Sequence, residues 1–229
     1  MSTITSAGGL ASTGGTLARA RLTTTLELLL VFAGILLYIW RWRYTYPWAC
    51  FLLFVGILLS HVVHRDTPSE LGLTTANLDA NARIALPLAL ALYLPMVAYG
   101  FARHALVLDI LPTRQALAWF AGYGVWCTFQ QYLMQSYFHH RLMSVIGNHH
   151  LSSLLVAIMF GGAHIPNPIL MVVTTVAGFM LAEVFAHHRN IWPLALAQTV
   201  GGLLIAAVSP PSLIHHMRVG PGYFFYRIR

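Results

Sequence analysis

"PILMVVTTVAGFMLAEVFA", residues 168–186, is a continuous apolar run that contains one charged side chain and is long enough to cross a membrane. A transmembrane helix needs about 20 mainly apolar residues. Further apolar runs occupy residues 26–40, 47–63, 84–101, 115–137, 151–162 and 191–208. None shows the alternation of a barrel strand, and a lipid-embedded backbone must satisfy its own hydrogen bonds. The sequence therefore predicts an all-α, polytopic transmembrane helical bundle of about seven helices, within a range of six to eight.

Composition supports a membrane environment. Hydrophobic residues make up 58% of the 229 residues and charged residues 8%, whereas a soluble domain carries about 25% charged residues. The predicted organisation has a flexible Ser/Thr/Gly/Ala-rich tail over residues 1–21, a single transmembrane domain over 22–208 and an interfacial C-terminal tail over 209–229. The polar connection over residues 65–83 is predicted to be a surface loop or an interfacial helix. We expect an integral protein of a prokaryotic cell (inner) membrane.

The net charge of +7 comes entirely from arginine, because the chain contains no lysine. Arginines flank the apolar runs on alternating sides, so the positive-inside rule assigns no orientation. Their positions favour interfacial anchoring to membrane lipids over binding of nucleic acid, and no nucleic-acid partner is predicted. Cys50 and Cys127 both lie in apolar runs, a pattern that indicates neither a disulfide framework nor a thiolate metal site.

Polar side chains within the apolar runs mark the candidate site, because such residues usually face the interior of a bundle. Gln131 and Gln135 are four residues apart and share a helix face, with Gln130 one step round. The simplest interpretation of the glutamines is hydrogen bonding between helices, which contributes about 0.6 kcal/mol on average. In "FGGAHIPNP", residues 160–168, Phe160 and His164 are also four apart, and prolines follow that end the helix. The whole set of intramembrane polar candidates is Glu27, His61, His64, Gln130, Gln131, Gln135, His164, Glu183 and Gln198.

Three segments together resemble the CAAX protease and bacteriocin-processing (CPBP, Abi-type) family of intramembrane endopeptidases, which includes the CAAX prenyl endopeptidases. They are "QQYLMQ" at 130–135, "FGGAHIPNP" at 160–168 and "NIWPLALAQTVGG" at 190–202. Family members show E-E-x-x-x-R, then F-x-x-x-H, then a segment like N-L-W-P followed by H-x-x-x-N. The order and spacing agree over residues 115–208, the predicted CPBP-like core.

The departures fall on the positions that carry the family's chemistry. Only His164 keeps the family residue. The two glutamates correspond to Gln130 and Gln131, the arginine to Gln135, the second histidine to Gln198 and the asparagine to Gly202.

The resemblance implies a glutamate that deprotonates water and histidines that stabilise the developing oxyanion. Glutamine cannot act as a general base, but its amide keeps the shape of glutamate and both donates and accepts hydrogen bonds. The prediction is therefore a proteolytically inactive protein whose neutral polar pocket binds a lipid or prenyl-type ligand, or a membrane-protein partner such as a larger complex. The predicted ligand-binding residues are Phe160, Asn167, Gln130, Gln131 and Gln198. His164 is the candidate acid or base if any chemistry remains, and no cofactor or metal is predicted.

Two enzymatic alternatives stay open. The first is an active CAAX-type endopeptidase, a hydrolase with a relocated base, for which Glu183 is the candidate; its simpler role is to pair with Arg189 or His187. The second is a histidine-rich membrane iron oxidase or hydroxylase, because eight of the twelve histidines occur as adjacent pairs and imidazole suits iron. Only "HVVH" at 61–64 has helical ligand spacing, and adjacent side chains on a helix diverge by about 100°.

Overall fold

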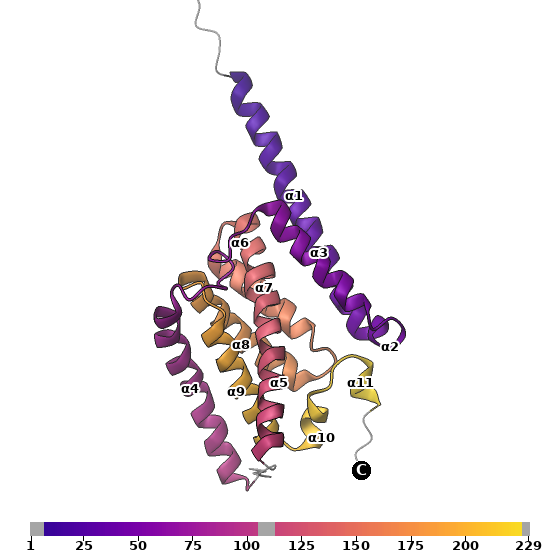
Figure 1. The fold of residues 1–229 in the computed structure, drawn as a ribbon, viewed down its shortest axis with the longest axis vertical. Helices are drawn as coiled ribbons and strands as arrows, with labels where there is room; N and C mark the ends of the chain where they lie inside the picture. Colours follow the sequence, from indigo (N-terminus) through magenta and orange to yellow (C-terminus); the bar gives the residue numbers. More distant parts are fainter. Residues whose placement is uncertain (1–6, 105–112, 226–229) are drawn as a thin grey trace, which may run out of the picture.

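The computed structural model describes residues 7–104 and 113–225, and every regular element within them is helical, which confirms the predicted all-α bundle (Figure 1). Three helical segments are long and apolar enough to span a membrane: Gly15–Thr45, Leu78–Ala102 and Pro168–His187. Three shorter apolar helices accompany them: Ala49–His64, His149–Gly162 and Trp192–Val208. The α-helices are α1 (Ala7–Leu37), α2 (Arg43–Thr45), α3 (Ala49–His64), α4 (Leu78–Ala102), α5 (Thr113–Gln131), α6 (His140–Ile146), α7 (His149–Gly162), α8 (Pro168–His187), α9 (Trp192–Val208), α10 (Pro211–Ile214) and α11 (Pro221–Phe224). Two π-helices, η1 (Tyr38–Trp42) and η2 (Tyr132–His139), and the 3₁₀-helix η3 (His215–Met217) complete the set.

Helices α1 and α3 form a hairpin at one side of the bundle, and the first part of α1 projects beyond it (Figure 1). Residues 1–21 were predicted to be a flexible tail. Residues 1–6 lie outside the described residues, but α1 begins at Ala7, so the remainder of that segment is helical. The hydroxyls of Thr23 and Thr24 donate to the Ala20 carbonyl at 2.9 and 3.0 Å. The threonines of this region thus bond within the helix instead of ending it.

Helices α7 and α8 pack closely because small residues line their contact. A β-carbon added to Gly178 would lie 3.5 Å from Cα of Ala157 and 3.2 Å from Cδ1 of Phe160. Close approach of backbones through small residues is a common way to join membrane helices. This contact fixes Phe160 and the turn that follows α7, where His164 lies.

The predicted helix over residues 115–137 is interrupted by η2, a wider turn of π-helix. Every residue from Met134 to His139 is buried, so this segment is surrounded by neighbours instead of having one exposed face. Its polar side chains reach different partners: the Ser136 hydroxyl donates to the Leu71 carbonyl at 2.6 Å, and the Tyr137 hydroxyl donates to Oε1 of Glu27 at 2.8 Å. The π-helical turn thus contacts distant segments of the chain, and π-bulges inside helices are frequent at functional sites.

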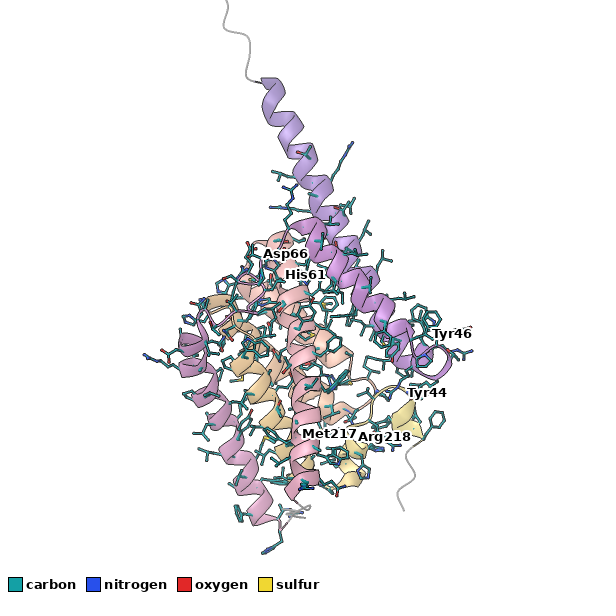
Figure 2. The ribbon with its side chains drawn as sticks, in the orientation of Figure 1. Tyr44, Tyr46, His61, Asp66, Met217 and Arg218 are labelled. Carbon is teal, nitrogen blue, oxygen red and sulfur yellow. The ribbon has the colours of Figure 1, made fainter. Side chains whose placement is uncertain are left out.

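A buried ionic network lies at the end of the bundle where Asp66 and His61 are labelled in Figure 2. Nη1 of Arg141 donates to Oδ1 of Asp66 at 2.9 Å, and Nη2 donates to Oδ2 of Asp66 at 2.5 Å and to the Ser60 hydroxyl at 3.1 Å. The two side chains are only 2% and 6% exposed. Burial raises the pKa of Asp66, but hydrogen bonds from Arg141 and His61, together with the guanidinium charge, outweigh burial and hold that pKa well below its usual value. The connection predicted to be a surface loop therefore begins with a buried carboxylate.

The segment after α9 folds back on the turn between α7 and α8. The Gly220 amide donates to the Ile165 carbonyl at 2.9 Å, and Ile214 is buried. Figure 2 shows Met217 and Arg218 on this segment, on the side of the bundle away from Asp66. Residues 209–229 were predicted to be an interfacial tail, but residues 209–225 are attached to the core beside His164. Contacts this distant in sequence leave no local pattern.

Candidate functional site

The four predicted glutamines meet in one chain of hydrogen bonds. Nε2 of Gln135 donates to Oε1 of Gln131 at 3.2 Å, and Nε2 of Gln131 donates to Oε1 of Gln198 at 2.6 Å. Nε2 of Gln198 then donates to Oε1 of Gln130 at 2.5 Å. Each of these bonds joins a donor hydrogen to a carbonyl-type acceptor, so the three bonds form without any charge. The glutamines therefore tie α5 and η2 to α9.

The chain of amides is buried at one end and open at the other. Gln131 and Gln135 are each 1% exposed, and Oε1 of Gln135 has no hydrogen-bond partner in the described part of the molecule. Gln130 is only half-buried and lines the cavities described below. Its Oε1 is occupied by Gln198, so the Gln130 amide nitrogen is the donor that the chain offers to a ligand.

His164 lies in the turn that follows α7, four residues after Phe160. Its Nδ1 lies 2.7 Å from the Phe160 carbonyl oxygen and 3.4 Å from the Thr174 hydroxyl oxygen. A carbonyl oxygen can only accept, so Nδ1 carries the proton and Nε2 of the neutral ring is an acceptor. No other described side chain bonds to Nε2. His164 thus offers the site a basic nitrogen held in one tautomer.

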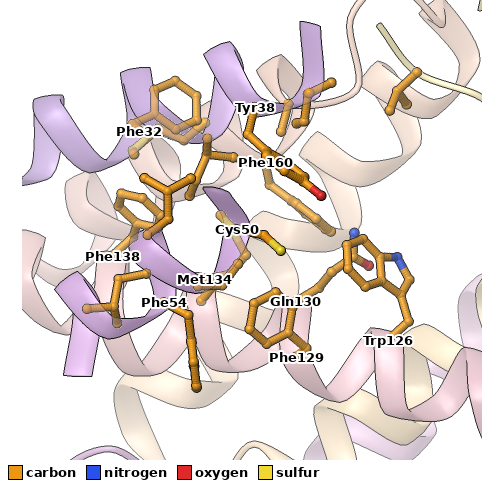
Figure 3. A pocket seen from close by; sticks show the side chains of 18 of the residues that line it. Phe32, Tyr38, Cys50, Phe54, Trp126, Phe129, Gln130, Met134, Phe138 and Phe160 are labelled. Carbon is orange, nitrogen blue, oxygen red and sulfur yellow. The ribbon is translucent and has the colours of Figure 1, made fainter. Parts of the chain in front are cut away.

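Two cavities of about 560 and 550 Å³ meet at these groups. The first lies between the α1–α3 hairpin and α5, η2 and α7, and Figure 3 shows the aromatic side chains around it, with Gln130 beside Trp126 and Phe129. The second lies between α4, α5, α8 and α9. Both are within the size range of small-molecule sites. The residues that line both are Arg43, Trp126, Gln130, Phe160, His164 and Val219.

Several lining residues were not predicted from the sequence. Arg43 is the one charged residue, among those described, that lines both cavities. Val219 lines both cavities, and Met217 lines the second. Aromatic and arginine side chains near helix ends are interfacial by default, so no local signal distinguishes Arg43 from the other arginines.

Two residues that were predicted to bind ligand, Asn167 and Gln131, line neither cavity. Asn167 was predicted to bind ligand, but it is fully buried and lines neither cavity. Its Nδ2 donates to the carbonyls of Ile214 and Arg218 at 2.8 and 3.3 Å, and its Oδ1 accepts from the Leu170 amide at 3.2 Å as the N-cap of α8. Gln131, also predicted to bind ligand, lines neither cavity and bonds to Gln198, which lines the second. Asn167 is thus a structural residue that holds the C-terminal segment beside the site.

Gly202, which the sequence resemblance aligns with an asparagine, lines the second cavity. A β-carbon there would collide with the hydroxyl of Tyr123. The aromatic ring of Tyr123 therefore fills the space that a larger side chain at residue 202 would need. Glycine at this position makes room for a tyrosine instead of providing a polar group.

Carboxylates lie away from this site. Of the six acidic residues, Asp109 is outside the described part, and none of the other five lines either cavity. Oε2 of Glu183 lies 2.8 Å from Nδ1 of His150, so its partner is neither His164 nor the predicted Arg189 or His187. Glu27 accepts from Ser60 and Tyr137 at the far end of the hairpin. The described residues therefore place no carboxylate where it can act as a base beside His164.

His61 and His64, the pair with the helical spacing of iron ligands, have different partners in the structure. Nδ1 of His61 lies 2.6 Å from Oδ2 of Asp66, whereas Nε2 of His64 lies 3.1 Å from Oε2 of Glu27. Each imidazole thus pairs with its own carboxylate. This spacing does not bring His61 and His64 to one shared ion.

The comparisons with known proteins agree with the motif spacing. The profile of the family described as "Type II CAAX prenyl endopeptidase Rce1-like" matches residues 112–203, which include all four glutamines and His164. No curated protein and no solved structure matches the chain. Residues 112–203 of this membrane protein are thus similar to the Rce1-like family of type II CAAX prenyl endopeptidases.

Proposed function

We propose that this chain is a noncatalytic member of its family that binds the apolar chain of a lipid or prenyl-type ligand in the cavities beside His164. The observation that carries the proposal is the hydrogen-bonded set Gln130, Gln131, Gln135 and Gln198. These neutral amides stand at the positions that the resemblance assigns to two glutamates, an arginine and a histidine. A general base must be titratable, and losing one typically lowers the rate by about 10²- to 10⁴-fold. The amides preserve a polar site without providing that base.

The cavity walls suit an apolar chain with a polar head. The first cavity is lined mainly by aromatic and aliphatic side chains, including Phe32, Phe54 and Phe138. Three polar side chains line both cavities: Gln130, His164 and Arg43. Gln198 and Thr174 add polar groups to the second cavity. Gln130 and Arg43 donate, while Nε2 of neutral His164 accepts. An oxygen-containing head group next to a long apolar chain fits this arrangement.

A cavity-filling substitution tests this proposal. Val219→Trp places a large ring where the cavities meet, so labelling of the protein by a photoactivatable farnesol probe in lipid nanodiscs is expected to need about tenfold more probe, a change equivalent to about 1.4 kcal/mol. Val62→Trp is the matched control, because Val62 is 73% exposed on α3 and lines neither cavity. The measurement is labelling as a function of probe concentration, with the labelled peptides identified by mass spectrometry.

Competition then defines the ligand class. Unlabelled farnesol that displaces the probe better than a phospholipid supports a prenyl ligand, and the reverse order supports an acyl lipid. Labelling that maps to residues lining neither cavity, or that is equally strong in Val219→Trp, contradicts binding in these cavities.

A further inference from the structure

Two histidines and a glutamate converge at the end of the α7–α8 pair opposite His164. His149 and His150 open α7, and Glu183 lies one turn before α8 ends at His187. One ligand-type atom from each of His149, His150 and Glu183 lies within 4.8 Å of the other two. Among the described residues, this is the one group of three or more histidine, cysteine, aspartate or glutamate side chains with such spacing.

The two adjacent imidazoles point the same way, contrary to the divergence predicted for a regular helix. His149 is the first residue of α7, and the preceding Asn148 is extended, with φ −123° and ψ 116°. The two ring centroids are 3.9 Å apart and the ring planes are inclined by 43°. The ring of His187 is a third neighbour, 5.2 Å from that of His149. The start of the helix thus gathers imidazoles that a mid-helix pair would separate.

Glu183 has an unused ligand atom in this group. Its Oε2 bonds to Nδ1 of His150 at 2.8 Å, but its Oε1 is buried without a hydrogen-bond partner in the described part of the chain. An unsatisfied buried acceptor costs free energy and calls for a partner. The nearby Ser153 hydroxyl, on the next turn of α7, lies 3.1 Å from Nε2 of His139 and also interacts with the Glu183 carboxylate. His150 occupies Oε2, so Oε1 is the carboxylate oxygen that a bound ion could take as a ligand.

We propose that His149, His150 and Glu183 bind one divalent transition-metal ion of the zinc class, with His187 or water as the fourth ligand. Imidazole nitrogen and carboxylate oxygen are the common non-thiolate ligands of Zn²⁺. Two such ligands, each about 2.0–2.1 Å from an ion, are at most about 4.2 Å apart, so only a modest side-chain rotation closes the site. The His150 side chain is 67% exposed, which permits both that rotation and entry of the ion from water.

This site is separate from the proposed ligand pocket. Helix α7 has 14 residues, so its two ends are about 20 Å apart at 1.5 Å per residue. The ion would join the first turn of α7 to the last turn of α8, and none of its three ligands lines either cavity. Metal binding and lipid binding can therefore succeed or fail independently.

Zinc titration of tag-free, chelator-treated protein in detergent tests the proposal. The wild-type chain is expected to bind one Zn²⁺ per chain. His150→Ala or Glu183→Gln is expected to weaken the zinc affinity by about tenfold or more. His64→Ala is the matched control, because His64 pairs with Glu27 and is not in the group of three. Co²⁺ substitution gives a second readout, since a tetrahedral site with histidine ligands produces visible absorption that Glu183→Gln should remove.

Stoichiometric binding that both variants weaken and the control retains supports the site. Absence of stoichiometric zinc in the wild type overturns it. Unchanged affinity in Glu183→Gln also overturns it, because the ion would then be held by surface histidines alone. His150→Ala alters an exposed side chain, so its result stands even if Glu183→Gln does not fold.

Discussion

Arg141→Met is expected to lower the free energy of unfolding by about 3 kcal/mol, because it leaves the carboxylate of Asp66 buried without its guanidinium partner. Three hydrogen bonds from Arg141, two to Asp66 and one to Ser60, are lost. His61 and His140 still contact Asp66, which keeps the loss near the lower end of the range for a broken buried pair. Urea unfolding in mild detergent, followed by tryptophan fluorescence, measures the change.

Arg83→Met is the matched control for this effect. Arg83 pairs with Asp79 four residues earlier on α4, and both side chains are 77% exposed. Exposed pairs of this kind contribute about 0.3–0.5 kcal/mol. The double variant Arg141→Met with Asp66→Leu should be more stable than Arg141→Met alone, since removing both charges avoids an unpaired one. Equal stability of Arg141→Met and Arg83→Met would contradict the buried network.

Gln131→Leu is expected to lower the free energy of unfolding by about 2 kcal/mol, because it breaks the chain of amides in its middle. Gln135, which is 1% exposed, then loses the acceptor of its Nε2 and is left with neither amide atom paired. The Oε1 of Gln198 loses its donor as well. The expected loss exceeds the average of about 0.6 kcal/mol for one interhelical hydrogen bond, since two groups lose partners. The same urea titration reports it.

The control is Gln115→Leu, an exposed glutamine near the start of α5, which should change stability by less than about 0.5 kcal/mol. A combined Gln131→Leu, Gln135→Leu and Gln198→Leu variant should recover part of the loss, because apolar replacement of all three leaves fewer unpaired groups. If Gln131→Leu matches Gln115→Leu, the amide chain does not contribute as described.

The helical architecture could be predicted from the sequence because each apolar run by itself indicates a helix. Residues 168–186 predicted a helix, and α8 spans Pro168–His187. The meeting of α5 with α9 was expected only through family spacing, since Gln198 lies far along the chain from Gln130 and Gln131. Helical periodicity places side chains on a face, but it does not say which other helix that face meets.

The parts that sequence analysis missed depend on contacts between distant segments. The π-helix η2 arises where residues Met134–His139 are buried on all sides. The C-terminal segment reaches the site through Asn167 and Gly220, neither of which differs in sequence from an ordinary turn residue. The histidines at 149 and 150 converge because α7 starts there, a boundary that local patterns locate only to within about two to four residues.

Turnover of a farnesylated peptide ending in a CAAX motif is the most direct test of the neutral amide site. Purified protein in lipid nanodiscs is incubated with the peptide, and mass spectrometry follows both bound peptide and released C-terminal tripeptide. Because no described carboxylate lies beside His164 to activate water, the expected result is binding of the farnesylated peptide with no tripeptide released over the protein-free control. Time-dependent release by the wild-type chain that His164→Ala abolishes would show that the site still hydrolyses peptides, and would contradict the account.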